Sequence, residues 1–288
     1  MAKELHAGIS FGDDSAQTVL LEIQGPEVKL WCIEEHPKDR FVDYWFLDDL
    51  FSLDRKTLSR VSRVSVALDH HSAFCHRFPL DNSLNQVDQN DQVQWELSHY
   101  IANYKLHDYI NDVRILRTRA REQMLDVLVA TVQRSFVFGL HELLADERLD
   151  LQTVEMSFYA AEYGVLSTYP EIKSKNCALV GISKQRVETG MLTSGRLSTY
   201  ASRSGDSFDD AHRFLENSFK EVDLSNIFLY GTSQASEWID GVRSVFGSRV
   251  IMPNPFRHMQ IASSCRNFDD FVGNEHRFAA CVGCALRK

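Results

Sequence analysis

The sequence contains no apolar segment that approaches the ~20 residues needed to cross a bilayer. Its N-terminus, MAKELHAGIS, leads directly into a predicted strand and has no signal-peptide core. Basic residues are also scarce: 31 Lys and Arg stand against 40 Asp and Glu, which gives a formal net charge of -9. We therefore expect a cytoplasmic protein that neither inserts directly into a membrane nor binds nucleic acid. The modest group Arg114, Arg117, Arg119 and Arg121 is interpreted as a solvated strand end and turn.

The sequence also lacks a convincing metal motif. Its six cysteines are interpreted as buried thiols, because disulfides are rare in the cytoplasm. Only CVGC, with Cys281 and Cys284, has the spacing of a metal-binding pair. Structural zinc sites usually contain two such pairs, so a packed helix is favoured here. A zinc or redox protein that uses Cys281 and Cys284 stays as an alternative.

Two regions share a strand pattern. Residues 8–22, GISFGDDSAQTVLLE, read as a strand, a turn and a returning strand, and a third strand follows the turn QGPE. Residues 177–183, CALVGIS, begin a second block, in which RVETGML and RLSTYA form a hairpin around TSGR. The 288 residues, 44% of them hydrophobic, are sufficient for two lobes. This order of strands predicts an internal duplication of topology.

Helices are predicted from apolar spacing. Residues 88–106 place Val93, Leu97, Ile101 and Tyr104 at helical intervals, and residues 134–149 align Phe136, Leu140 and Leu143 on one face. A hairpin is predicted over residues 113–132, and a final helix over residues 275–288. Large helical aromatics are most often core residues, which gives the expectation of burial for Trp95, Phe136, Phe214 and Trp238.

An ordered series of weak motifs resembles the PilM family of type IV pilus assembly proteins, in the actin-like ATPase superfamily. Residues 8–22 align with that family's opening strand and first phosphate loop, LYGTSQAS resembles its late strand, turn and helix, and FAACVGCALRK resembles its closing helix. The cytoplasmic part of type II secretion protein L has a closely related plan. The resemblance implies an α/β, actin-like (ribonuclease H-like) fold with mixed sheets.

The same resemblance implies two lobes. The first, residues 1–170, would carry an inserted subdomain. The second, residues 171–288, would contribute a C-terminal helix that packs back on the first. The short passage from the second hairpin to the following helix and strand leaves no room for the extra subdomain that the family has in its second lobe.

The resemblance places degenerate nucleotide loops at Gly12, Asp13, Asp14, Ser15, Gly181, Ser183, Gly231 and Thr232. Two departures affect these loops: Ser10 and Gly181 stand where the family has aspartates, whose carboxylates are suited to holding Mg²⁺. Asp13 and Asp14 would also repel a triphosphate. We therefore interpret the opening loop as the remnant of a phosphate loop. No cofactor is expected, and binding of ATP with Mg²⁺ is disfavoured.

The function that the resemblance implies is a non-catalytic scaffold at the cytoplasmic face of the inner membrane. Its partners would be a bitopic membrane protein, whose short cytoplasmic tail it holds in a groove of the first lobe, and other pilus or secretion assembly proteins. Aromatic residues between Val64 and Leu166 are candidates to line that groove, among them Trp95, Tyr100, Tyr104, Phe136 and Phe138. An active actin-like ATPase that binds nucleotide is the main alternative.

Overall fold

The computed structural model describes residues 4–12, 15–37, 44–183, 186–204, 208–220, 222–231, 236–265 and 267–287. Strands of the first sheet have the order β14-β3-β2-β1-β4-β8. They are β1 (Leu5–Phe11), β2 (Ser15–Gln24), β3 (Glu27–Pro37), β4 (Val61–Leu68), β8 (Asp150–Met156) and β14 (Gln260–Ile261). The first three form the predicted antiparallel meander, and β4 and β8 then join in parallel.

The second sheet repeats this plan with the order β11-β10-β9-β12-β13. Its strands are β9 (Asn176–Ile182), β10 (Arg186–Thr193), β11 (Arg196–Ser204), β12 (Asn226–Gly231) and β13 (Val250–Ile251). Here too a meander is followed by parallel strands. The predicted repetition of the strand pattern is thus confirmed in the topology of the two sheets, while the division of the chain at residue 170 stays a prediction.

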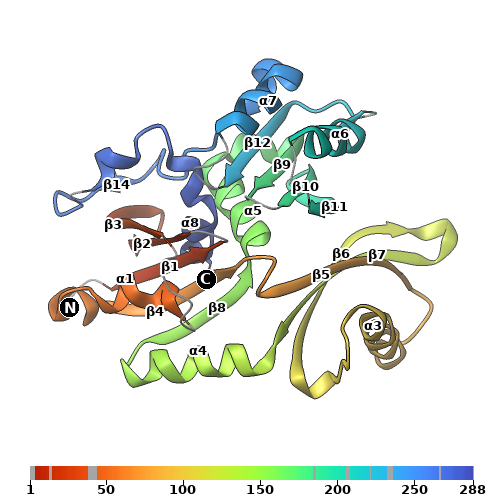
Figure 1. The fold of residues 1–288 in the computed structure, drawn as a ribbon, viewed down its shortest axis with the longest axis horizontal. Coiled ribbons are helices and arrows are strands. Elements are labelled where there is room, and N and C mark those ends of the chain that lie inside the picture. Colours follow the sequence, from red (N-terminus) through yellow and green to blue (C-terminus); the bar gives the residue numbers. More distant parts are fainter. Residues whose placement is uncertain are drawn as a thin grey trace.

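A smaller third sheet extends from the side of the molecule (Figure 1). It has the order β5-β7-β6, and its strands are β5 (Ala73–Asp81), β6 (Tyr109–Arg119) and β7 (Met124–Gln133). The predicted hairpin is the antiparallel pair of β6 and β7. One face of the sheet packs against α3 (Gln86–Tyr100), which contributes the buried Val93 and Leu97.

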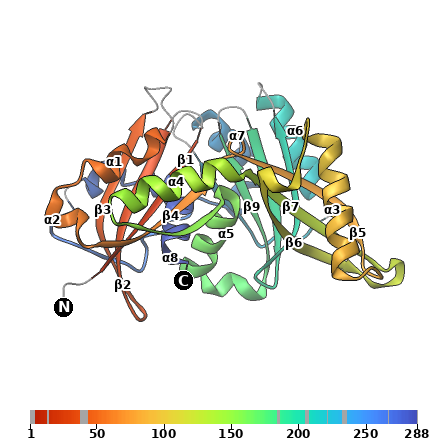
Figure 2. The same cartoon turned by 90° about the horizontal axis from the view of Figure 1, so that it is seen from below.

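The remaining helices are α1 (Asp48–Phe51), α2 (Arg55–Leu58), α4 (Arg134–Asp146), α5 (Ser157–Thr168), α6 (Phe208–Phe219), α7 (Ser236–Phe246) and α8 (Ala279–Leu286). Two views place α5 and α8 between the first and second sheets (Figure 1, Figure 2). They touch through glycines, since a Cβ atom built on Gly283 would lie 1.8 Å from the Ala160 carbonyl oxygen. On its other side α8 packs on β1, where a Cβ on Gly8 would lie 2.0 Å from the Cys281 carbonyl oxygen.

Several predictions about helices are wrong in detail. The helix α3 ends at Tyr100, and Ile101 is its C-cap, so the helix is shorter than its apolar spacing predicted. In α4 the inward face is completed by Leu144, which is fully buried, whereas Leu143 is 38% exposed. The predicted last helix is a 3-10 turn, Glu275–Phe278, followed by α8.

The prediction that the helical aromatics are buried is also partly wrong. Trp95 is 60% exposed, because α3 covers a sheet of only three strands and has one buried face. Phe136 and Phe214 are partly buried against the hydrophobic clusters, as expected. The side chain of Trp238 lies outside the described part of the chain.

Candidate functional site

Residues from the predicted nucleotide loops meet at one cavity between the first and second sheets. Gly12 follows β1, Gly181 lies in β9, Ser183 follows β9, and Gly231 ends β12; all four line this cavity. Asp13, Asp14 and Thr232 lie outside the described residues. The cavity, which we call the cleft, has a volume of about 70 Å³, well below the ~300–1,000 Å³ typical of small-molecule pockets.

The first-sheet side of the cleft is a hydrogen-bond network. Ser10 Oγ donates to Gln17 Oε1 at 3.0 Å, and Gln17 Nε2 donates to Ser15 Oγ at 2.8 Å and to Glu35 Oε1 at 3.0 Å. Arg277, from the turn before α8, forms an ion pair with the same Glu35 carboxylate. Ser10 and the predicted loop residue Ser15 therefore already have partners within the protein.

On the opposite side, Tyr230 occupies the space in front of Gly181. A Cβ atom at position 181 would lie 2.6 Å from the Tyr230 hydroxyl oxygen and 2.7 Å from its Cζ. The aspartate expected there by family resemblance would therefore collide with the tyrosine ring. The Tyr230 hydroxyl is buried without a hydrogen-bond partner in the described structure, and burial raises its pKa, so it stays protonated.

A carboxylate does line the cleft, but from a different strand. Glu188 of β10 accepts a hydrogen bond of 2.5 Å from the Tyr200 hydroxyl. Burial raises the pKa of Glu188, which favours its neutral form, although Tyr200 and the nearby Arg186 oppose this shift. A carboxyl group that resists ionisation is a poor ligand for Mg²⁺, which prefers charged oxygen donors.

The CVGC pair lies inside the hydrophobic core. Cys281 and Cys284 are both fully buried in α8. Burial raises the pKa of both thiols, and Cys284 Sγ lies 3.4 Å from the Ser65 carbonyl oxygen. Thiolates are the species that bind metals and react. Protonated thiols packed between helix and sheet favour the interpretation of this pair as part of a packed helix.

A larger hollow lies where the third sheet meets the first sheet and α5. Two cavities there, of about 640 and 110 Å³, share the lining residues Asp112, Val154, Glu155 and Tyr159. We call the two together the groove. Its walls come from β6, β7, β8 and α5, and Arg287 closes one side.

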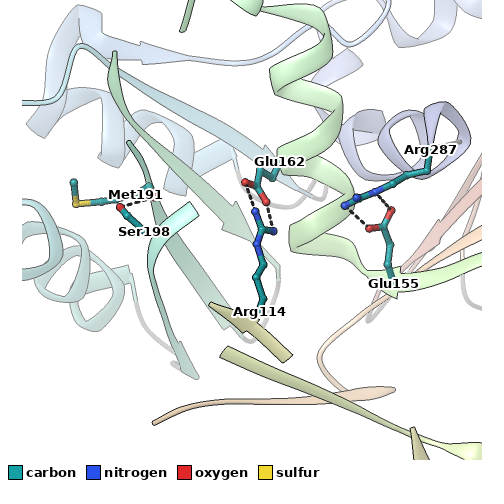
Figure 3. A network of polar contacts seen from close by, with 6 residues as sticks. All are labelled: Arg114, Glu155, Glu162, Met191, Ser198 and Arg287. Atoms are coloured by element: carbon teal, nitrogen blue, oxygen red, sulfur yellow. Dashed lines mark hydrogen bonds and ion pairs between the residues drawn. The ribbon is translucent and has the colours of Figure 1, made fainter. Parts of the chain in front are cut away.

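Two arginine–glutamate pairs form part of the wall (Figure 3), and each arginine also lies over a tyrosine ring, so that each pair belongs to a unit of arginine, tyrosine and glutamate. Arg114 of β6 donates to both carboxylate oxygens of Glu162, at 2.5 and 2.7 Å, and its guanidinium lies 4.8 Å from the Tyr159 ring centroid.

In the second unit Arg287 pairs with Glu155 at 2.8 Å and lies 4.8 Å from the Tyr163 ring centroid. Since Tyr159, Glu162 and Tyr163 share one face of α5, this helix orients both arginines.

No local pattern in the sequence by itself indicates this groove. The prediction of a solvated Arg114 is wrong, because its guanidinium pairs with the buried Glu162 carboxylate. The five aromatics named as examples from residues 64–166, Trp95, Tyr100, Tyr104, Phe136 and Phe138, are not part of the described lining of this groove; Trp95, Tyr100 and Phe138 are exposed elsewhere. The groove aromatics are Tyr159 and Tyr163. Their spacing with Glu162 on one helical face was the available signal, but its partner Arg114 is far away in sequence.

Comparison of the structure with solved structures identifies its fold. Over 99% of this chain and 98% of the other, it is similar to a chain of the PilM-PilN type IV pilus biogenesis complex, with a TM-score of 0.74 and 15% sequence identity. It is also similar to a Bacteroides thetaiotaomicron protein with an actin-like ATPase fold and unknown function, with a TM-score of 0.54 and 15% identity over 93% and 95% of the two chains. The chain therefore has the actin-like ATPase fold, as predicted.

Comparisons of sequence add no closer relationship. No protein-family model and no curated protein matches the chain. Among the described residues, no helix is both long and apolar enough to span a membrane.

Proposed function

We propose that this protein is a non-catalytic scaffold of a type IV pilus or related secretion complex. It would hold the cytoplasmic tail of a bitopic inner-membrane protein and join it to other assembly proteins. The observation that carries this proposal is the contrast between the two hollows: the cleft is about 70 Å³, whereas the larger cavity of the groove is about 640 Å³. The similarity to a chain of the PilM-PilN complex over nearly the full length supports the same function.

The groove has the composition that a peptide site needs. Apolar side chains of Val113, Ile115 and Leu166 line it beside the polar groups of Asp112 and Glu155. The strand β6 is the edge of its sheet and lies beside β11 without pairing with it among the described residues, so its outer backbone groups can accept an extended chain where β11 leaves room. An acidic protein also suits a tail that carries the basic residues typical of the cytoplasmic side of a membrane span.

Site-specific crosslinking in the native host tests this proposal. A photoreactive amino acid replaces Ile115, which is 56% exposed and lines the groove. The matched control carries it at Val87, which is 67% exposed on α3 and lies outside the groove lining. We expect the Ile115 variant to crosslink to the tail of a single-span membrane protein, and the Val87 variant not to. Crosslinks only to soluble proteins, or equal crosslinking from both positions, would contradict the proposal.

The absence of catalysis is tested separately by calorimetric titration with ATP and Mg²⁺. We expect no tight binding, because Ser10 and Gly181 supply no carboxylate and Tyr230 fills the space beside Gly181. A dissociation constant near 1 μM, or about -8 kcal/mol, would favour the ATPase alternative instead.

A further inference from the structure

The groove contains buried hydroxyl groups without partners. Thr131 of β7 and Tyr159 of α5 are 2% and 4% exposed, and neither Thr131 Oγ1 nor the Tyr159 hydroxyl has a hydrogen-bond partner in the described structure. Both residues line the smaller cavity of the groove. Buried polar atoms in proteins are almost always hydrogen-bonded, so these two mark positions where a ligand can supply the missing bond. Burial also raises the pKa of Tyr159, which keeps its hydroxyl available as a donor.

Asp112 supplies a carboxylate without a direct ion-pair partner at the same place, although the nearby Arg114 acts on its charge at longer range. It is an exposed residue of β6 and lines both cavities of the groove. Glu155 and Glu162 are paired with arginines, whereas no ion pair or hydrogen bond joins the Asp112 carboxylate to any other residue that the structure describes. With three carboxylates and two guanidiniums, the groove lining carries one formal negative charge.

We infer that Asp112 binds a positively charged group of an extended peptide in the groove, while the Tyr159 and Thr131 hydroxyls hydrogen-bond to the peptide backbone. The charged group is a lysine or arginine side chain, or the peptide's amino terminus; all offer N–H donors to a carboxylate. The inference rests on the proposed function, because it assumes that the groove holds a peptide tail. It adds the chemistry by which the tail is selected.

The geometry favours a cation over an anion or an apolar segment alone. The guanidiniums of Arg114 and Arg287 are already paired with glutamates and stacked on tyrosines, so neither offers a free charge to an acidic ligand. The apolar Val113 and Ile115 alternate with Asp112 and Arg114 along the same edge strand. A peptide that alternates a basic and an apolar residue along β6 would match this pattern.

Short synthetic peptide libraries provide the test. In each library one position is fixed as lysine, arginine, norleucine or glutamate, and binding to the full chain is followed by fluorescence anisotropy. We expect a fixed lysine or arginine to bind about two- to fivefold more tightly than norleucine, the range for an exposed ion pair. The preference should weaken as salt is added. Acetylation of the peptide amino terminus distinguishes the terminal amine from a side chain as the source of charge.

Variants of the protein assign the preference to Asp112. Asp112→Asn should abolish it, and Asp112→Lys should transfer it to glutamate. Asp91→Asn is the matched control, because Asp91 is an exposed aspartate on α3 outside the groove lining. Peptide binding without a preference for basic residues, or a preference that survives in Asp112→Asn, would overturn this inference and leave the proposed function standing. If no library binds, both are wrong.

Tyr159→Phe tests the hydroxyl independently. Because the hydroxyl has no partner in the described structure, its removal should leave the thermal midpoint of the free protein unchanged or raise it. Peptide affinity should fall about three- to tenfold, as expected for one lost hydrogen bond. A lower thermal midpoint, or unchanged affinity for peptides that bind the wild type, would show that this hydroxyl does not serve the ligand.

Discussion

The contact between Tyr230 and Gly181 can be tested by a double-mutant cycle. In Gly181→Ala the new Cβ would lie 2.6 Å from the tyrosine hydroxyl and 2.7 Å from Cζ, closer than the 3.0 Å that real Cβ atoms respect. Both residues lie in the packed region between the sheets, so we expect this overpacking to lower the free energy of unfolding by about 1–3 kcal/mol. Tyr230→Leu removes the two colliding atoms and should by itself cost about 2–4 kcal/mol.

The informative quantity is the coupling between these substitutions. If Tyr230 fills the space in front of Gly181, the double variant should be more stable than the sum of the single effects predicts, by about 1–2 kcal/mol. Urea unfolding of the four proteins measures this. Tyr200→Leu combined with Gly181→Ala is the control, because Tyr200 is a buried tyrosine that the built Cβ does not contact. Additivity of Gly181→Ala and Tyr230→Leu within about 0.5 kcal/mol would refute the reasoning.

Three further substitutions test other parts of the structure. Because the pKa of Glu188 is raised in the folded state, the folded wild type binds more protons than the unfolded chain at a pH above the ordinary carboxyl range. The stability of the wild type therefore falls as pH rises through this range. Glu188→Gln lacks the titrating group, so its stability should increase relative to that of the wild type. Urea unfolding over a pH series checks this, and a difference independent of pH would contradict it. Arg114→Met leaves Glu162 buried without its partner and should cost about 2–3 kcal/mol, less than for a fully buried pair because Arg114 is 29% exposed. Replacing Glu162 by Met as well should recover most of the loss; additive losses would show that the pair is not coupled. Gly283→Ala should cost about 3 kcal/mol or more, or prevent folding, and a soluble variant with an unchanged thermal midpoint would disprove the close contact of α5 and α8.

The strands and most helices could be predicted from the sequence because their signals are local. Apolar residues alternate along the strands, and the turns at Gly25 and Gly195 both have positive φ. These signals define the hairpins that close the two meanders. The loop positions Gly12, Gly181, Ser183 and Gly231 were implied by the family resemblance and not by these local signals. The resemblance also suggested that these positions meet, and the structure places all four at one cleft.

Which side chains fill the cleft and the groove was decided only by the tertiary structure. Tyr230 meets Gly181 because β12 and β9 are parallel neighbours, a pairing that directly opposes these two residues. Arg114 and Glu162 pair because the third sheet folds against α5, and no periodicity within β6 could indicate that partner. The burial of Trp95 likewise depends on tertiary structure. The sequence of a helix shows which residues share a face, but the neighbouring elements decide how many faces are covered. In α3 only one face is covered, so Trp95 lies on the surface and not in the core.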